Sequence, residues 1–335
     1  MGLLDIIALA LSASSISMLG VLVVRRSHLA RRAKRQREIE EGLKGIAMEL
    51  LHAGAEPPPH LAEAERQALA DLLGRYARAI RGPTHDRIVD YFEREGTVAR
   101  ELAVMADARA GWRRATAAFR LGDIGPVSVA PALAAALNDS DRDVRIAAAR
   151  SLGRLRTPEA TQDLLGAAVD RRVPPALIRW TLLQIGAPAL PRLMPGLTSD
   201  SERLRAGAVQ LIGLLGGPAE AAQIEDGLRD RSAMVRAQAA RALSRIGGRR
   251  NLPALRQATW DRIPMVREAA ADALGQLRDR ESVALLAIRA GGDQFDVARA
   301  CARAVAAIDP AQAAERAAAS GSVHLLEAAD LAEIA

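Results

Sequence analysis

Histidine and cysteine, two side chains that commonly carry catalysis, are scarce in this sequence of 335 residues, which has five and one of them. The single cysteine, Cys301, lies in the alanine-rich stretch "ARACARA", where a small packed residue is expected rather than a nucleophile. The glycine-rich "GLLGGP" at 213–218 joins two expected helices, which is typical of a turn and not of a phosphate-binding loop. No two histidines stand at a metal-ligand spacing; they are His28, His52, His60, His85 and His324. The sequence therefore predicts a non-enzyme that holds no metal and no cofactor.

The basic charge of the chain is concentrated in one place. The formal net charge is +6 and the sequence pI is near 10.4. Residues 25–37 alone carry seven positive charges and no acid, so the rest of the chain is close to neutral. A basic groove for nucleic acid would spread its charge along a domain, and no nucleic-acid partner is expected. The seven residues are Arg25, Arg26, Arg31, Arg32, Lys34, Arg35 and Arg37.

An apolar run precedes this basic block. Residues 3–24 contain one charge, Asp5, and as a helix would span roughly 33 Å, enough for a hydrocarbon core of about 30 Å. Arginines follow the run rather than precede it, which argues against a signal peptide. The sequence predicts a single-pass inner-membrane anchor with the N-terminus outside, and the basic block against anionic lipid headgroups. Small residues that would form a helix-packing face are Ala10, Ala13, Ser14, Ser17 and Gly20.

An internal repeat fills most of what remains. Half of the residues are apolar but only 2% are aromatic, and alanine and leucine favour helices. Arginine recurs at steps of 30 or 31 residues, with Pro175 and Ala298 at the two places where it is missing, and a ladder of aspartates runs in register with it. Each unit is predicted to be two helices, whose apolar faces are buried only when neighbouring units stack. The arginines are Arg114, Arg145, Arg205, Arg236 and Arg267.

The repeated segments "DSDRDVRIAAARSLGRL" and "DRIPMVREAAADALGQL" resemble the HEAT repeat, in the short form that also occurs in phycobilisome lyases. The resemblance covers about residues 112–309 and implies an α-solenoid. It also implies that recurring aspartate and arginine side chains pair between neighbouring repeats, so these residues are interpreted as a structural ladder. Its members are Asp139 and Arg145, Asp200 and Arg205, Asp230 and Arg236, and Asp261 and Arg267.

The expected organisation is an all-α chain in which stacked HEAT-like hairpins follow one transmembrane helix. Residues 1–24 would form the anchor, and 25–59 a basic juxtamembrane helix that ends at "GAEPPPH", since consecutive prolines cannot continue a helix. Residues 60–111 are predicted to form a helical cap or a diverged repeat. The HEAT-like repeats would occupy 112–309, and a C-terminal helical cap 310–335.

The predicted function is that of a membrane-anchored cytoplasmic scaffold or adaptor for protein–protein interaction. Its expected partner is a membrane-associated enzyme or a transport or secretion complex. Solenoids offer a long groove, expected here to be lined by the second helices. Candidate groove contacts are Arg192, Met194, Arg250 and Arg256. Two alternatives remain, an enzyme of the phycobilin-lyase type and a nucleic-acid-binding HEAT-like protein. The repeated His-Glu pairs of HEAT-fold oxygenases do not occur in this sequence.

Overall fold

A computed structural model describes residues 18, 25–26, 38–54, 56–58 and 60–334. All regular elements in these residues are helices, and no strand occurs among them. The predicted all-α class is therefore confirmed.

The chain divides into two compact units. The first comprises Met1–Arg100 with Asp123–Pro126, and the second comprises Glu101–Gly122 with Val127–Ala335. Each unit is described by itself.

The first unit packs two helices of about four turns and a shorter third one. Residues 38–53 are helical and bury Leu43 and Leu50. The end of this helix is closed by Arg87, whose Nη1 donates to the carbonyls of Leu51 and His52 at 2.5 and 2.9 Å. These carbonyls have no partner within the helix, so the guanidinium fixes the chain before the proline-rich loop. The following helices are α2 (Glu63–Ala79), α3 (Pro83–Arg94) and α4 (Thr97–Asp107), the last of which continues into the second unit.

The predicted membrane anchor is not supported by the structure. No helix in the described part of the chain is long and apolar enough to cross a bilayer. The single-pass inner-membrane localisation predicted from the sequence is contradicted by this finding. Of residues 1–24 only Met18 is described, and the five residues of the expected packing face lie outside the described residues. Of the seven basic residues the structure describes Arg25 and Arg26, which are helical and exposed.

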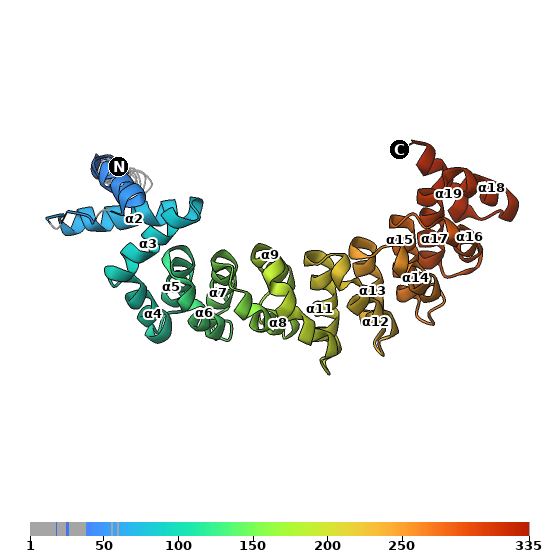
Figure 1. Cartoon of the computed structure of the whole chain (residues 1–335), viewed down its shortest axis with the longest axis horizontal. Helices are drawn as coiled ribbons and strands as arrows, with labels where there is room; N and C mark the ends of the chain where they lie inside the picture. The colour runs from blue at the N-terminus through green and yellow to red at the C-terminus, as the bar shows by residue number, and fades with distance from the viewer. Residues whose placement is uncertain (1–17, 19–24, 27–37, 55, 59, 335) are drawn as a thin grey trace, which may run out of the picture. The chain divides into compact units, whose positions relative to one another are not determined.

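The second unit is a stack of helical hairpins (Figure 1). In each hairpin a long first helix is followed by a one-turn 3₁₀ segment and a shorter second helix. The first helices are α5 (Gly111–Ile124), α7 (Arg142–Leu155), α9 (Pro175–Ile185), α11 (Glu202–Leu215), α13 (Ala233–Ile246), α15 (Pro264–Gln276) and α17 (Phe295–Ile308). The second helices are α6 (Ala130–Ala136), α8 (Thr161–Val169), α10 (Leu190–Leu193), α12 (Ala221–Asp226), α14 (Leu252–Ala258) and α16 (Val283–Gly292). The stack ends with α18 (Pro310–Ser320) and α19 (Val323–Ile334).

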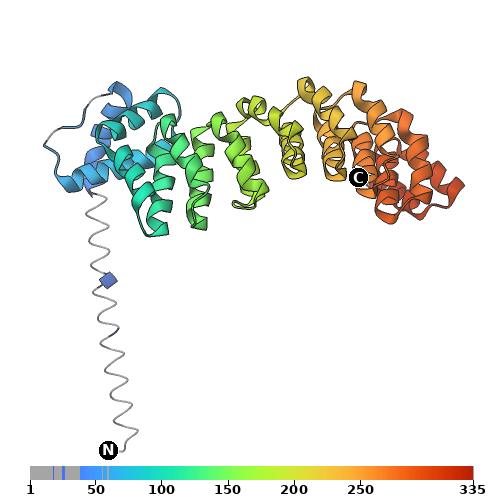
Figure 2. The same cartoon turned by 90° about the horizontal axis from the view of Figure 1, so that it is seen from below.

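Short 3₁₀ segments connect these helices. Those before the second helices are η1 (Val127–Val129), η2 (Pro158–Ala160), η3 (Ala187–Ala189), η5 (Pro218–Glu220), η7 (Arg249–Asn251) and η8 (Arg280–Ser282). Two more, η4 (Met194–Thr198) and η6 (Gly227–Arg229), extend α10 and α12. The turned view in Figure 2 shows the first helices following one another along the stack.

Small residues let consecutive first helices approach closely. A Cβ added at Gly213 of α11 would lie 2.4 Å from the Cβ of Ala242 in α13. At the equivalent Gly275 of α15 it would lie 2.9 Å from Ala304 of α17. Such distances are too short for a side chain, so glycine is required where the next helix presents an alanine. The glycine that recurs eight residues after the ladder arginine is thus a packing residue.

Candidate functional site

The arginine–aspartate ladder joins the first helices α5, α11, α13 and α15 to the loop of the following repeat. In α7, Nε of Arg145 donates instead to the backbone carbonyl of Arg172 at 2.8 Å. In α11, Nε and Nη2 of Arg205 donate to the two carboxylate oxygens of Asp230 at 2.7 and 2.9 Å. Arg236 of α13 makes the same two bonds to Asp261, also at 2.7 and 2.9 Å. Bidentate pairs of this kind fix orientation as well as distance. Equivalent pairs join Arg114 to Asp139 and Arg267 to Asp293.

The same guanidinium also holds the loop of its own repeat. Nη1 of Arg205 donates to the backbone carbonyls of Ser199 and Asp200 at 2.7 and 3.0 Å. Arg145 donates in the same way to the carbonyls of Asp139 and Ser140. The predicted pair Asp139–Arg145 is thus joined through the backbone of Asp139, while its carboxylate binds the arginine of the preceding repeat.

Two irregular repeats interrupt the ladder in different ways. Pro175 stands where α9 would carry the arginine, and the Asp200 carboxylate has no hydrogen bond or ion pair among the described residues. Ala298 stands at the same position in α17. Nearby, Arg289 of α16 donates to Asp293 at 2.6 Å and adds a second cation beside that carboxylate.

The electrostatics of the ladder match a structural role. Hydrogen bonds from Arg205 lower the pKa of Asp230, and those from Arg114 lower the pKa of Asp139. Both carboxyls therefore stay ionised at neutral pH, and each also accepts a backbone N–H of its own loop. The carboxylates of Asp139 and Asp230 are thus used within the solenoid.

The four predicted groove residues have different environments. Arg256 of α14 binds Asp279 through two bonds of 2.6 Å and also Glu281 at 2.6 Å, so it holds the next repeat. Arg250 is exposed in η7. Arg192 is exposed in α10, and its carbonyl accepts a hydrogen bond from Gln162. Met194 is half-buried at the start of η4. Arg192 and Met194 lie on one hairpin, and Arg250 and Arg256 lie on another, so the four residues do not form one site.

An apolar surface on the first helices has the clearest character of a contact site. Trp112 of α5 is 71% exposed, and Trp180 of α9 is 48% exposed. Within the repeat frame, Trp112 stands two residues before the ladder position and Trp180 five residues after it. Seven residues are close to two helical turns, so both side chains leave the same face of their first helices. Between these helices, α7 presents Ile146 and Arg150 on the equivalent face.

A shallow hollow of about 340 Å³ opens on this surface between α5 and α7. Its apolar lining includes Phe119 and Ile146, and its polar lining includes Asp143 and Arg150. The guanidinium of Arg154 lies 4.2 Å from the centroid of the Phe119 ring and holds the ring in place. We call the surface formed by Trp112, Phe119, Ile146 and Trp180 the first-helix face.

The third tryptophan, Trp260, is also exposed but lies elsewhere. It follows α14, and the Arg289 guanidinium stacks 4.1 Å from its ring centroid. Arg289 is itself paired with Asp293 of the solenoid, so the stacked guanidinium fixes one face of the Trp260 ring.

The residues considered for chemistry are placed as follows. Cys301 is fully buried in α17, and burial raises the pKa of its thiol to about 12. Its thiolate is therefore not accessible near neutral pH. No group of three or more His, Cys, Asp or Glu side chains suited to a metal ion occurs among the described residues.

Comparison with known families identifies the repeats. The family model described as HEAT repeats matches two stretches of the second unit. Residues 101–178 and 222–307 are HEAT repeats. The predicted solenoid of HEAT repeats is thereby confirmed. Comparison with curated protein sequences gives no match.

Solved structures offer only distant likeness. Human deoxyhypusine hydroxylase is 21% identical over 82% of this chain and 98% of its own, with a TM-score of 0.33. The complex of CpcE and CpcF of phycocyanin lyase from Nostoc sp. PCC7120 is 20% identical over 76% of this chain and 97% of its own, with a TM-score of 0.29. At these TM-scores neither likeness bears on the function of this chain.

Proposed function

We propose that this HEAT-repeat chain is a scaffold that binds a partner protein through its first-helix face. The observation that carries the proposal is the exposure of Trp112 and Trp180 on the same face of α5 and α9, the first helices on either side of α7. Tryptophan leaves a large apolar area in water when it is exposed, and it is enriched among the residues that dominate binding energy. A chain with only three tryptophans presents two of them on this face.

The hollow between α5 and α7 supports the same function. Phe119 and Ile146 provide an apolar floor, and Asp143 and Arg150 provide charges at its edge. Protein interfaces commonly combine an apolar centre with a polar rim. The partner expected here is a folded protein that presents an apolar anchor side chain to the hollow.

Site-specific photo-crosslinking tests this function. A photoreactive phenylalanine analogue replaces Trp112 in one variant and Val127, a 58% exposed residue of η1, in a matched control. The proposal expects one discrete crosslinked protein from the Trp112 position in native cells, and no such product from the Val127 position. Equal labelling from both positions would contradict it. A crosslinked dimer of this chain would make the partner a second copy.

A further inference from the structure

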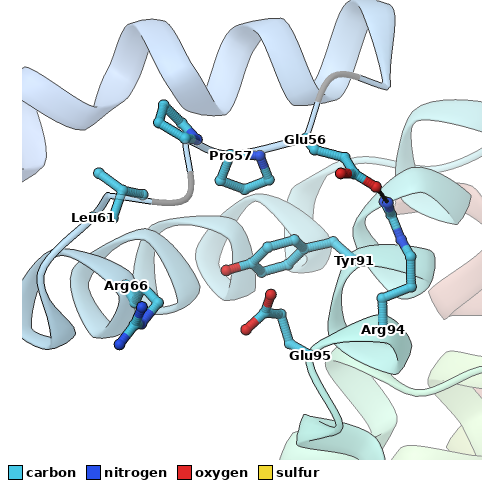
Figure 3. A pocket seen from close by; sticks show the side chains of 8 residues that line it. Glu56, Pro57, Leu61, Arg66, Tyr91, Arg94 and Glu95 are labelled. Carbon is cyan, nitrogen blue, oxygen red and sulfur yellow. Dashed lines mark hydrogen bonds and ion pairs between the residues drawn. The ribbon is translucent and has the colours of Figure 1, made fainter.

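A cleft in the first unit has the features of a separate binding site. It opens between the proline-rich loop and helices α2 and α3, with a volume of about 350 Å³ (Figure 3). Pro57, Pro58 and Leu61 form its apolar wall, and Tyr91 lies opposite them. The loop is positioned by Glu56, whose Oε1 accepts from Nη1 of Arg94 on α3 at 2.8 Å. The loop and α3 therefore hold the cleft open from two sides.

Tyr91 lines this cleft and brings a hydroxyl group to it. Only 4% of the residue is exposed, and its ring packs edge-to-face against Phe92 with centroids 5.3 Å apart. The hydroxyl makes no hydrogen bond to any described residue, and Figure 3 shows it between the side chains of Arg66 and Glu95. Burial raises the pKa of Tyr91, and the neighbouring Glu95 raises it further. The ring is buried, whereas the hydroxyl has no partner among the described residues and can bind a ligand that enters the cleft.

The arginines that line the cleft have ion-pair partners, whereas one of its carboxylates has none among the described residues. Arg66 is paired with Glu63 at 2.8 Å, and Arg94 is paired with Glu56 at 2.8 Å. The carboxylate of Glu95 lines the cleft and has no hydrogen bond or ion pair within the described ranges. Arg66 also interacts electrostatically with Glu95, but its hydrogen bonds go to Glu63, so the Glu95 carboxylate is the charged group of the cleft that keeps no hydrogen-bonded partner among the described residues. An entering cation would meet the open charge, whereas an anion would have to compete with Glu63 and Glu56.

We propose that this cleft binds an alkylammonium or guanidinium cation, with Glu95 as its counter-ion and the Tyr91 hydroxyl as a second acceptor. The apolar wall of Pro57, Pro58 and Leu61 would cover the methylene stem, as such stems commonly pack on apolar surface while the charged head binds a polar group. Lysine and arginine side chains of a protein have this chemistry, and so do free polyamines. This site is independent of the first-helix face, so either proposal can fail alone.

Tyrosine-selective NMR of the full chain tests the proposal. The chain has two tyrosines, Tyr76 and Tyr91, so ¹³C-labelled tyrosine rings give two resolvable sets of signals. Titration with Nα-acetyl-lysine amide, which keeps the side-chain ammonium, is expected to shift the Tyr91 signals in a saturable manner and to leave those of Tyr76 unchanged. N-acetyl-norleucine amide, which keeps the stem without the charge, and N-acetyl-glutamate are expected to give no saturable shift.

Two matched variants assign the counter-ion. E95Q is expected to weaken binding of the lysine ligand about tenfold or more, the usual worth of a charge-assisted hydrogen bond. E93Q alters an exposed acid in the last turn of α3, two residues from Glu95 and outside the cleft, and is expected to bind within about twofold of the wild type. No saturable shift with the lysine ligand, an equal shift with the glutamate ligand, or unchanged binding by E95Q would each overturn the proposal. Tighter binding of an Ala-Lys-Ala peptide than of spermidine would assign the cation to a protein, and the reverse order to a free polyamine.

Discussion

The sharpest prediction compares two aspartates at the same position of neighbouring repeats. Asp230 accepts two bonds from Arg205 of the preceding first helix at 2.7 and 2.9 Å, and the arginine side chain is only 6% exposed. The Asp200 carboxylate has no such partner, because Pro175 occupies the donor position. D230N removes a charge from a buried pair and leaves the Arg205 guanidinium only partly compensated, whereas D200N removes a charge with no direct partner.

The expected costs differ by several-fold. A hydrogen bond between charged groups is worth about 1.5–3 kcal/mol, and leaving a buried charge uncompensated costs more, so D230N should lose about 2–3 kcal/mol of stability. D200N should stay within about 0.5 kcal/mol of the wild type, as surface substitutions usually do. Because solenoids open locally, the assay is hydrogen exchange of α11 and α13 by mass spectrometry, supported by urea unfolding followed by circular dichroism.

The pH dependence of this difference has a defined sign. Hydrogen bonds from Arg205 lower the pKa of Asp230 in the folded state, below the unfolded value of about 3.9. The stabilisation is therefore fully present above about pH 4 and is lost as the pH falls through the folded pKa. The gap between wild type and D230N should close in that acidic range. Equal costs for D230N and D200N at pH 7, or a gap that widens in acid, would refute the ladder as an energetic element.

Three further predictions follow from packing and exposure. G213A should cost about 1–3 kcal/mol, since its Cβ would meet Ala242 at 2.4 Å, while G217A, with no atom within 4 Å of the new Cβ, should be near neutral; urea unfolding distinguishes them. Cys301 should not react with a thiol reagent at pH 8 in the folded chain and should react at once in denaturant, because burial raises its pKa to about 12. W112A should change the free energy of unfolding by less than about 0.5 kcal/mol, because this side chain is 71% exposed.

The repeat was predictable because its residues recur at a fixed spacing, but the partners within it were not. The sequence places Asp139 close to Arg145, and only the packed structure shows that the carboxylate turns back to Arg114. Arg256 had the appearance of a free groove residue, yet it reaches Asp279 of the next repeat. Long side chains can reach either neighbour, so their pairing depends on the distance between packed hairpins, which the spacing alone does not provide.

The proposed contact surface lies on the first helices, whereas the sequence favoured the second helices. Solenoid grooves are commonly lined by second helices, and the candidates were chosen there. The signal for the first-helix face was nevertheless in the sequence, because Trp112 and Trp180 occupy repeat positions seven residues apart. The cleft at Tyr91 had no comparable signal, since it depends on how the proline-rich loop packs on α3.

The affinity of the chain for the partner identified by crosslinking shows whether the first-helix face binds a protein. W112A and W180A should each weaken binding about tenfold or more, as expected for anchor residues, while V127A should bind within about twofold of the wild type. If both tryptophan variants bind as tightly as the wild type, the first-helix face is not the binding surface.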